Sequence, residues 1–544
     1  MNRINIIGSG LAGLSAALTL AENGMSCRLI SPMPSERAQS VMAEGGINAA
    51  LDTMGENDSA EQHFEDTMKG GVFLADPNAV WGLCSDAPAI VNRLCDLGAA
   101  LRMQGSSPVL RNFGGQKKKR TAYAKSSTGK ILMTALIDAV RKYEVSGLVE
   151  RYANHRLEEL IIESSQCRGV KIKNIRNGDI IPLTGAVLLA VGGMNSLFPG
   201  LTTGTVINTG DVTAEAFFKG AELYNLEFIQ YHPTTVSVPE KRCLISEAAR
   251  GEGGRLFVMR NGEPWYFMED KYPEYGNLSP RDVVSREIEL VKKESGCGNS
   301  VYLDMTKLDS NVWKNKLSDL RDECIELLGK DPAAEPIEVS PGIHYFMGGI
   351  GVDEKHRTNI KGLYAAGECA CQYHGANRLG GNSMLGAVYG GRIAALTAME
   401  ENRQEQQPEE KTDIIKGDGC PVMTESSISA EAAGILKDSL GIFRSEEKLT
   451  KALAELSALY ENESDPVMKK RLLLGRAVLL SASERRESRG AHTRTDYPDR
   501  NDREFRKTTV ALYKDGNVVV SMRDIPVKRG QADEISDRDK EKKV

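Results

Sequence analysis

The 544-residue sequence predicts an α/β protein with a Rossmann-like nucleotide-binding sheet. The first observation is a short apolar run, Ile4 to Ile7, followed directly by the glycine motif GSGLAG at 8–13. The second is the helical stretch Leu14 to Glu22, which leads to another short strand at Cys27 to Ile30. Strand, GxGxxG, helix and strand in this order form the context in which such a motif binds a dinucleotide.

Each glycine of the motif has a physical reason to be glycine. Gly8 permits the tight turn, Gly10 lets the backbone approach a pyrophosphate, and Gly13 lets the helix pack on the strand. The free N–H groups at the start of the helix would then face the phosphates. A position after the second strand often carries an acid that binds ribose, and Ser31 stands there with a weaker hydroxyl contact. The alternative for the motif by itself is an ordinary tight turn.

Two later segments favour FAD as the dinucleotide. Residues 186–190 form a strand of the buried type that ends in Val191-Gly192-Gly193. After a long insertion, residues 362–365 form another such strand, followed by Ala366-Gly367-Glu368 and a helix from about Ser383 to Glu400. A strand that rejoins the sheet after a long insertion and is followed by an acid fits a dinucleotide that spans the sheet. Glu368 could then bind a ribitol or ribose hydroxyl. The alternative is an acid at a helix start, favoured by the helix dipole.

The bulk composition excludes several classes of protein. Hydrophobic residues make up 41% and charged residues 26%, the balance of a soluble globular protein. The net charge of −6 argues against a nucleic-acid surface, which would be basic. The ten cysteines form no CxxC pair, so no ligand set for an iron–sulfur cluster, zinc or c-type haem is visible. No window of about 20 apolar residues predicts a membrane span, and no signal peptide is evident, so we expect a cytoplasmic protein.

Several motifs occur together in this chain. They are SVMAEGGINAA (40–50), FGGQ (113–116), TGD (209–211), QYHPT (230–234), SEAARGEGG (246–254), SPRDVVSREI (279–288), HYFMGGI (344–350), HGANRLGGNS (374–383) and ESRGAHTRTDYPDRND (487–502). As a set they resemble the flavoprotein subunit of fumarate reductase and succinate dehydrogenase, which shares a superfamily with L-aspartate oxidase. The resemblance implies FAD-dependent reduction of fumarate to succinate, or the reverse.

The resemblance also implies the domain organisation. A Rossmann-like FAD-binding domain (1–228 and 345–403) would be interrupted by an α+β capping domain (229–344). A C-terminal helical domain (412–500) would follow, and then a C-terminal segment (501–544). Residues 400–411 are rich in Glu, Gln and Pro and predict a linker, whereas the charged end from 530 to 544 predicts a disordered tail.

By the same resemblance, four side chains would hold a dicarboxylate. His344 and Arg378 would bind one carboxylate, since Arg presents a planar fork that matches it. His232 and Ser246 would bind the other and twist it out of conjugation. The family usually has Thr where Ser246 stands, so this pocket keeps the hydroxyl and loses a methyl group. A buried structural role is the alternative for each of these residues.

The resemblance assigns the remaining chemistry to an arginine relay. Arg281 would donate the proton, Glu247 and Arg250 would resupply it, and Phe113 would cover the substrate. Hydride would come from the N5 atom of the flavin. Arg281 could instead be an early helix residue paired with Asp282. The residues expected to bind FAD are Gly8, Gly10, Gly13, Ser31, Ser40, Gly45, Gly46, Gly193, Asp211, Glu368, Ser383 and Leu385.

One departure from the family pattern concerns flavin attachment. Respiratory members attach FAD covalently through a His, and Gln39 stands at that position here. An amide cannot form the linkage, so we expect non-covalent FAD, a lower flavin potential and a preference for reduction. L-Aspartate oxidase also binds FAD without a covalent bond and is one alternative. Its family places a carboxylate near residues 100–125 to hold an ammonium group, but no Asp or Glu occurs from Leu97 to Leu136.

Two further alternatives stay open, as does the source of electrons. The substrate could be another unsaturated acid, or the chain could be an electron-transfer or assembly module without a substrate of its own. Because no cluster or haem motif is visible, electrons would come from a partner iron–sulfur subunit or from a small reduced carrier. Such a partner could hold this protein at the inner face of the membrane.

Overall fold

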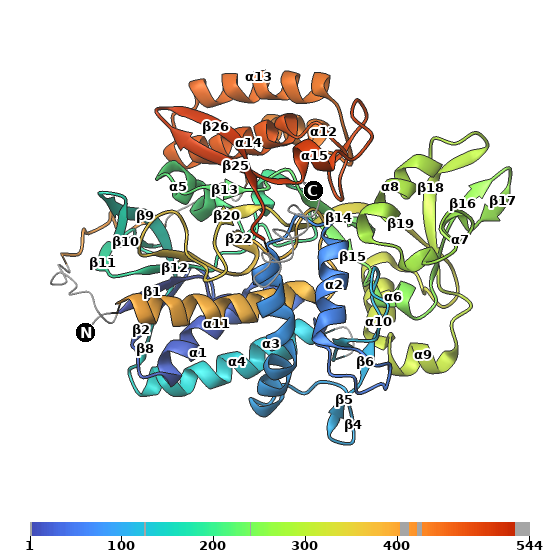
Figure 1. Ribbon diagram of the computed structural model, residues 1–544, viewed down its shortest axis with the longest axis horizontal. Coiled ribbons are helices and arrows are strands. Elements are labelled where there is room, and N and C mark those ends of the chain that lie inside the picture. Colours follow the sequence, from blue (N-terminus) through green and yellow to red (C-terminus); the bar gives the residue numbers. More distant parts are fainter. Residues whose placement is uncertain (1–2, 125–126, 240, 403–412, 422–426, 528–544) are drawn as a thin grey trace, which may run out of the picture.

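The computed structural model describes residues 3–124, 127–239, 241–402, 413–421 and 427–527. Its centre is a five-stranded parallel sheet in the order β21-β12-β1-β2-β8 (Figure 1). The strands are β1 (Ile4–Ile7), β2 (Cys27–Ser31), β8 (Val149–Ala153), β12 (Val187–Leu189) and β21 (Leu363–Ala365). The returning strand predicted at 362–365 therefore adds to one edge of this sheet.

The two faces of the parallel sheet are covered differently. Ile4 and Ile6 pack with α1 (Leu11–Glu22), α4 (Thr128–Val145) and α11 (Asn382–Asn402). Ile7 points to the opposite face and packs with the antiparallel sheet of β9 (His155–Glu163), β10 (Gln166–Asn174) and β11 (Ile180–Thr184). Side chains alternate along a strand, so an apolar strand with helices on one face and a sheet on the other is buried on both faces.

The inserted segment forms a second unit with its own core. Its sheet has the order β15-β14-β19-β18-β16-β17 and projects to one side in Figure 1. The strands are β14 (Ile229–Val238), β15 (Lys241–Leu244), β16 (Arg255–Arg260), β17 (Glu263–Trp265), β18 (Cys297–Asp304) and β19 (Ile337–Phe346). Helices α8 (Arg281–Val291) and α10 (Ser318–Leu328) pack on it, and Phe267 lies in the core. The predicted junction at 228 falls just before β14, and the one at 344 falls inside β19.

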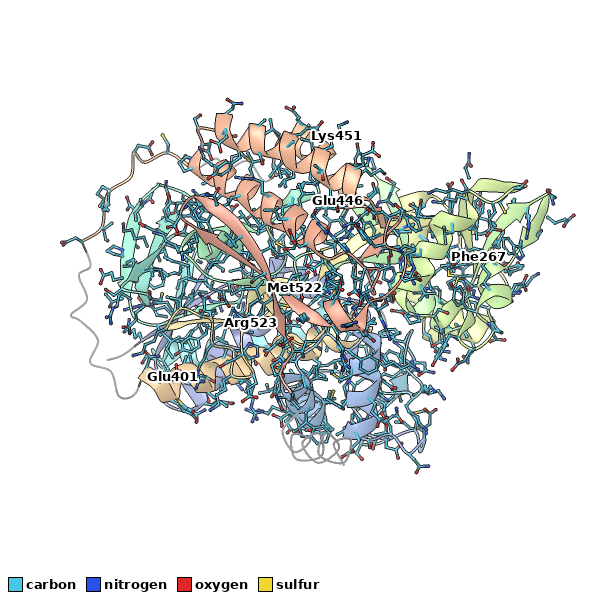
Figure 2. All side chains as sticks on the ribbon, turned by 45° about the horizontal axis from the view of Figure 1, so that its top comes forward. Phe267, Glu401, Glu446, Lys451, Met522 and Arg523 are labelled. Atoms are coloured by element: carbon cyan, nitrogen blue, oxygen red, sulfur yellow. The ribbon has the colours of Figure 1, made fainter. Side chains whose placement is uncertain are left out.

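The last part of the chain is helical and then extended. Helices α12 (Ala430–Ser439), α13 (Glu446–Asn462) and α14 (Pro466–Glu484) lie within 412–500, the range in which the resemblance implies a helical domain. Strands β25 (Lys507–Lys514) and β26 (Asn517–Asp524) then join β13 (Leu223–Tyr224), β20 (Gly349–Gly351) and β22 (Ala370–Cys371) in one sheet. In Figure 2, Met522 and Arg523 mark β26 near the middle of the molecule, and Glu446 and Lys451 mark α13 above it.

This C-terminal hairpin is not part of the sequence prediction. Its partner β13 lies almost 300 residues earlier, and no local pattern reveals a pairing at that separation. Most of the predicted linker and all of the predicted tail lie outside the described residues. No helix among the described segments is both long and apolar enough to cross a membrane.

Candidate active site

One long cavity of about 580 Å³ connects the dinucleotide motif with the predicted substrate residues. It begins beside Gly8, Gly10 and Ser31 and ends at the junction with the inserted unit. Of the predicted site residues, it is lined by Gly8, Gly10, Ser31, Ser40, Gly45, Gly46, Phe113, Asp211, His232, Ser246, Glu247, Arg281, His344, Glu368, Arg378 and Ser383. The cavity therefore brings together segments that are far apart in the sequence.

Four predicted residues stand behind the wall of this cavity. Gly13 packs against the strand, where an added Cβ would lie 1.9 Å from Gly8 O. An added Cβ at Gly193 would lie 2.7 Å from Glu368 Oε1. Leu385, in the first turn of α11, is fully buried in the core. Arg250 lies behind Glu247 as seen from the cavity, with its Nη2 atom 3.5 Å from Glu247 Oε1.

The start of α1 has the form that a pyrophosphate site needs. An added Cβ at Gly8 would lie 2.1 Å from Ala190 O, so only glycine fits the turn. The first turn of α1 holds no acidic side chain, and the Leu11 N–H donates to Ser40 Oγ at 3.3 Å. The other N–H groups of the first turn are left for an anion, which the dipole of a 12-residue helix favours. These residues and the length of the cavity fit FAD.

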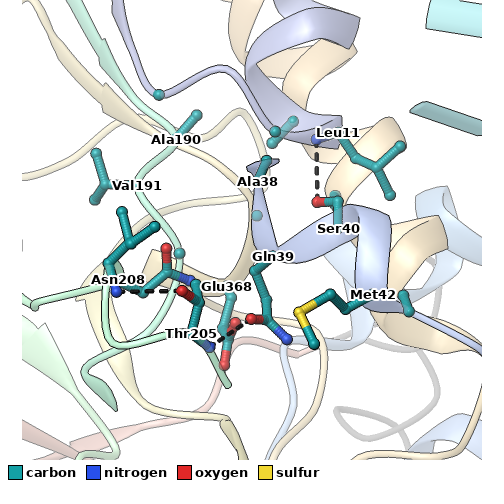
Figure 3. Close-up of a pocket in the computed structure, with 18 of the residues that line it drawn as sticks. Leu11, Ala38, Gln39, Ser40, Met42, Ala190, Val191, Thr205, Asn208 and Glu368 are labelled. Carbon is teal, nitrogen blue, oxygen red and sulfur yellow. Dashed lines mark hydrogen bonds between the residues drawn. The ribbon is translucent and has the colours of Figure 1, made fainter. Parts of the chain in front are cut away.

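Gln39 contacts the loop on the far side of the cavity. Its Oε1 accepts a hydrogen bond of 2.6 Å from the Thr205 N–H (Figure 3). Asn208 closes the same loop through a hydrogen bond from its N–H to Thr205 O at 3.1 Å. The amide at position 39 thus has a local structural partner within the wall of the cavity.

Two carboxylates near the middle of the cavity have different hydrogen-bond partners. Glu368 Oε1 accepts the Phe346 N–H at 3.1 Å, and burial raises the pKa of Glu368 to about 7. Asp211 is bound at 2.5 and 2.9 Å by Arg471 from α14. Because the Asp211 carboxylate is engaged there, its backbone at the start of helix α5 (Asp211–Phe218) is the part that can face a cofactor.

Two histidines from neighbouring strands face each other across the inner end of the cavity. His232 on β14 and His344 on β19 have ring centroids 5.2 Å apart. Burial and the nearby positive groups hold the pKa of both imidazoles well below 6.5, so both are neutral at pH 7. His344 Nδ1 lies 2.8 Å from Thr203 Oγ1. His232 Nε2 is buried and has no hydrogen-bond partner within the described ranges.

Arg378 lies beside the two histidines in the loop before α11. Its guanidinium stacks on Tyr345, with Cζ 4.4 Å from the ring centroid. Its Nε atom is buried without a hydrogen-bond partner among the residues that the structure describes. Burial and the charge of Arg281 lower the pKa of Arg378 to about 9. Both effects disfavour a bare cation, so a bound anion would stabilise the charged form.

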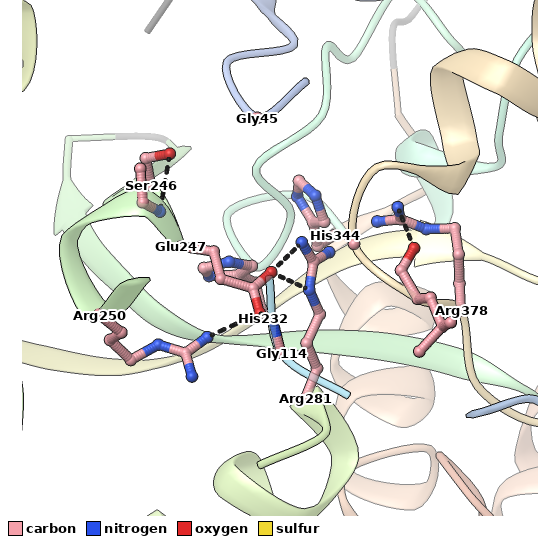
Figure 4. A network of polar contacts seen from close by, with 12 residues as sticks. Gly45, Gly114, His232, Ser246, Glu247, Arg250, Arg281, His344 and Arg378 are labelled. Carbon is pink, nitrogen blue, oxygen red and sulfur yellow. Dashed lines mark hydrogen bonds and ion pairs between the residues drawn. The ribbon is translucent and has the colours of Figure 1, made fainter. Parts of the chain in front are cut away.

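Arg281 is held by a carboxylate on the opposite side. Arg281 Nε and Nη2 donate to Glu247 Oε2 at 2.9 and 2.5 Å (Figure 4). Glu247 Oε1 accepts the Gly114 N–H at 3.0 Å and lies 3.5 Å from Arg250 Nη2. Burial by itself would raise the pKa of Glu247, but Arg281 and Arg250 outweigh it and hold that pKa at about 2. The order Arg281, Glu247, Arg250 is therefore a continuous row of charged groups.

Gln230 is a site residue that the sequence analysis missed. Its Oε1 accepts from Arg281 Nη1 at 3.2 Å and from Arg378 Nη2 at 3.0 Å. Its Nε2 donates to Asn377 Oδ1 at 2.9 Å and to Arg378 O at 2.8 Å. One fully buried amide thus fixes the separation of both guanidiniums. A signal was present, because Gln230 and His232 are two apart on one strand and share a face.

We expect Gln230→Leu to lower kcat/KM by about 10²-fold, because both guanidiniums lose their common partner and shift. The matched control is Gln116→Leu. Gln116 is also buried and donates to Gly380 O at 2.8 Å, but it touches neither guanidinium. Steady-state kinetics check the difference. A Gln230→Leu variant as active as the control would rule out this role for the amide.

Glu44 is the second residue that was missed. It lines the cavity next to Gly45, hydrogen bonds with Ser246, and its Oε2 is buried without a hydrogen-bond partner in the described chain. Burial raises its pKa well above 4.5, with a further contribution from Glu323. Burial therefore favours the protonated form of Glu44, in which its O–H would be a donor. The sequence analysis named Gly45 and Gly46 as site residues but did not name Glu44, which directly precedes them.

Two family models match the chain. The family model "FAD binding domain" matches residues 4–384, and "Fumarate reductase flavoprotein C-term" matches residues 430–535. The chain is 38% identical to the succinate dehydrogenase flavoprotein subunit of Bacillus subtilis, over 94% of each chain. It is 34% identical to the 8-methylmenaquinol:fumarate reductase flavoprotein subunit of Wolinella succinogenes, over 97% of this chain and 91% of the relative.

Among solved structures, the chain is similar to a variant of the quinol fumarate reductase flavoprotein FrdA of E. coli. The two share 28% sequence identity and superpose with a TM-score of 0.85, and the match covers 97% of each chain. The similarity extends through the parallel sheet, the inserted unit and the C-terminal helices.

Proposed function

This chain belongs to the family of succinate dehydrogenase and fumarate reductase flavoprotein subunits, and from that premise we propose that it reduces fumarate to succinate. It carries an FAD-binding domain and is a flavin-dependent oxidoreductase of the class that acts on CH–CH bonds. The observation that carries the proposal is the convergence of Arg281, Arg378 and two neutral imidazoles on one buried point of the cavity.

The charge of this point supports a dicarboxylate. Arg250, Arg281 and Arg378 contribute three positive charges, and Glu247 neutralises only one of them. Burying uncompensated charge is costly, so the site is built for a ligand that brings negative charge. His344 and Arg378 would hold one carboxylate of the substrate, while His232 and Ser246 would hold the other. The partnerless His232 Nε2 and Arg378 Nε are N–H positions that such oxygens would satisfy.

The chain's own residues would deliver the proton. Bound FAD would supply the hydride, and that chemistry belongs to the cofactor. Arg281 would release a proton to the substrate carbon and be reprotonated through Glu247. Because Glu247 is an unprotonated carboxylate at pH 7, it would only pass on a proton that it receives from Arg250, and Arg250 would recover its own proton from solvent. A fixed guanidinium at the reacting carbon also stabilises the negative charge that develops there. Phe113, which lines the cavity and is buried, would keep water from the reacting face.

Glu44 supports a diacid rather than an amino acid as substrate. An ammonium group on the substrate would need a carboxylate nearby. Glu44 lies next to Ser246, but burial raises its pKa and disfavours the charged form, so it is a poorer partner for an ammonium group than a solvated carboxylate would be. This arrangement makes L-aspartate the poorer ligand for the Ser246 side of the site.

We further propose that FAD binds without a covalent bond, because Gln39 offers an amide that is already engaged by Thr205. After precipitation with trichloroacetic acid, essentially all flavin absorbance is expected in the supernatant. The absorbance of the neutralised supernatant and in-gel flavin fluorescence of the denatured chain are the two measurements. A yellow, fluorescent pellet would refute non-covalent binding.

Electrons would come from a separate redox protein. No group of three or more metal-ligating side chains occurs within the described segments. We propose that the donor is an iron–sulfur protein bound to this chain, and that contact with the membrane is made through partners rather than through this chain. Without the covalent substituent on the ring the flavin potential is lower, which favours the direction of fumarate reduction.

A parallel assay separates the main candidates. The FAD-loaded protein is supplied with a reduced viologen dye under argon and then with fumarate; dye oxidation that depends on fumarate is expected. In the second arm, L-aspartate and oxygen are supplied and hydrogen peroxide is measured. Peroxide release without any fumarate-dependent dye oxidation would replace this proposal by an amino-acid oxidase.

A further inference from the structure

A second cavity of about 550 Å³ lies outside the wall of the candidate active site. One side of it is formed by β6 (Leu110–Arg111) and the hairpin of β4 (Met103–Gln104) and β5 (Ser107–Pro108). The other side is formed by α6 (Ala248–Gly251) and Lys316 of the inserted unit. We call it the outer cavity.

The lining of the outer cavity is strongly basic. Arg102, Arg111, Lys119 and Lys316 face it, and Glu252 is its single acid among the described lining residues. Lys316 pairs with Glu252 at 2.6 Å, and Lys119 pairs with Glu56, which stands outside the lining, at 3.1 Å. When Glu252 and Glu56 are counted against the four cations, a surplus of two positive charges remains. Lys119, one of the four cations, belongs to the run QKKKR at 116–120.

Two features make this more than a solvated basic surface. Arg111 is buried, and although burial lowers its pKa to about 10, it stays a cation at pH 7. Asn112 lines the same cavity, and its Oδ1 is buried without a hydrogen-bond partner within the described part of the chain. A buried amide of this kind needs a ligand or water, and a flip of the amide would present its N–H₂ to an anion.

The outer cavity shares a wall with the active site. Arg111 donates to Gly45 O and lies 5.2 Å from the Phe113 ring centroid, and both Gly45 and Phe113 line the inner cavity. On the other side, Glu247 lines the inner cavity while Ala248 lines the outer one. Arg102, which also lines the outer cavity, links the FAD-binding part of the chain to the inserted unit by donating to Asn315 O at 2.9 Å. An anion bound in the outer cavity would therefore be separated from the proposed substrate by the wall that the two cavities share.

We propose that the outer cavity binds a small carboxylate dianion of the same class as the substrate, and that it concentrates this dianion at the junction of the two units. The proposal rests on the proposed function for the identity of the ligand. A basic, partly enclosed cavity beside a site for a dianion raises the local concentration of that dianion and its rate of association.

Succinate is titrated calorimetrically into the oxidised, FAD-loaded protein at fixed ionic strength. Two succinates per chain are expected. Arg102→Gln with Lys316→Gln should remove one site and keep the other, whereas Arg378→Gln should remove the opposite one. The control pair Lys117→Gln with Lys314→Gln removes the same charge from exposed positions that do not line the cavity, and it should keep both sites.

The outcomes separate the two proposals. A single site in the wild type that only Arg378→Gln removes would overturn the outer cavity as a binding site. A single site that only the Arg102 and Lys316 changes remove would leave the outer cavity standing and overturn the proposed function. Displacement by inorganic phosphate as efficient as by fumarate would overturn the assignment to a dicarboxylate.

Kinetics give an independent readout. For Arg102→Gln with Lys316→Gln we expect kcat/KM for fumarate to fall about fivefold at low ionic strength, with kcat unchanged, and the difference from wild type to vanish at high salt. An identical salt dependence in this variant and in the Lys117 and Lys314 control would contradict the concentrating role.

Discussion

Arg281→Gln is expected to lower turnover with fumarate by about 10³-fold while the bound flavin keeps its visible spectrum. The effect is expected to be local, because the change removes the group proposed to face the reacting carbon and leaves the walls of the FAD cavity in place. Arg281 is also the only residue of the proposed relay that contacts both Glu247 and Gln230 within the described structure.

The matched control for Arg281 is Arg286→Gln on the same helix. Arg286 pairs with Asp282 at 3.1 Å and does not line the cavity, so we expect kcat within about threefold of wild type. Stopped-flow and steady-state rates on both variants, with flavin content measured in each, decide the matter. Near-normal turnover of Arg281→Gln would remove the proton-donor role.

Arg378→Gln is expected to weaken fumarate binding by about 10²-fold to 10³-fold, because a buried charged partner of a carboxylate is lost. Arg378→Lys should recover only part of this, since an ammonium cannot reproduce the planar fork stacked on Tyr345. The dissociation constant of succinate for the oxidised protein, read from flavin difference spectra, measures the effect.

A substrate analogue tests which atoms Arg378 holds. Fumaric acid monoamide has one carboxylate and one neutral amide, so it can bind in two orientations. In one of them the amide lies at residue 378, where no cation is then needed. We therefore expect Arg378→Gln to cost clearly less with the monoamide than with fumarate. An equal loss for both ligands would mean that the guanidinium acts by supporting the fold of the loop rather than by binding a carboxylate.

The nucleotide-binding part could be predicted because its signals are local. Strand, glycine motif and helix are contiguous, and at Gly8 and Gly13 an added Cβ would collide with the backbone. The helical domain after the linker could be expected from the family resemblance. In contrast, the pairing of β25 with β13 depends on residues almost 300 positions apart, and nothing near either strand reveals its partner.

The site residues likewise divide into those with a local signal in the sequence and those without one. His232, Arg281, His344 and Arg378 could be named from their motifs, and the structure places all four on one cavity, while their roles stay predictions. Gln230 and Glu44 were missed because each acts through a neighbour. The importance of Gln230 follows from two guanidiniums that arrive from other segments, and that of Glu44 follows from its burial beside Ser246.

The central claim is that this site passes a hydride from the flavin and a proton from Arg281 to a C4 diacid. Its most direct test is to reduce the purified flavoprotein with one equivalent of dithionite under argon, mix it with fumarate in a stopped-flow instrument and record the oxidised-flavin band. The account predicts full return of the band and one succinate formed per flavin, with neither seen for Arg281→Gln. A reduced flavin that stays reduced in the presence of saturating fumarate would contradict it.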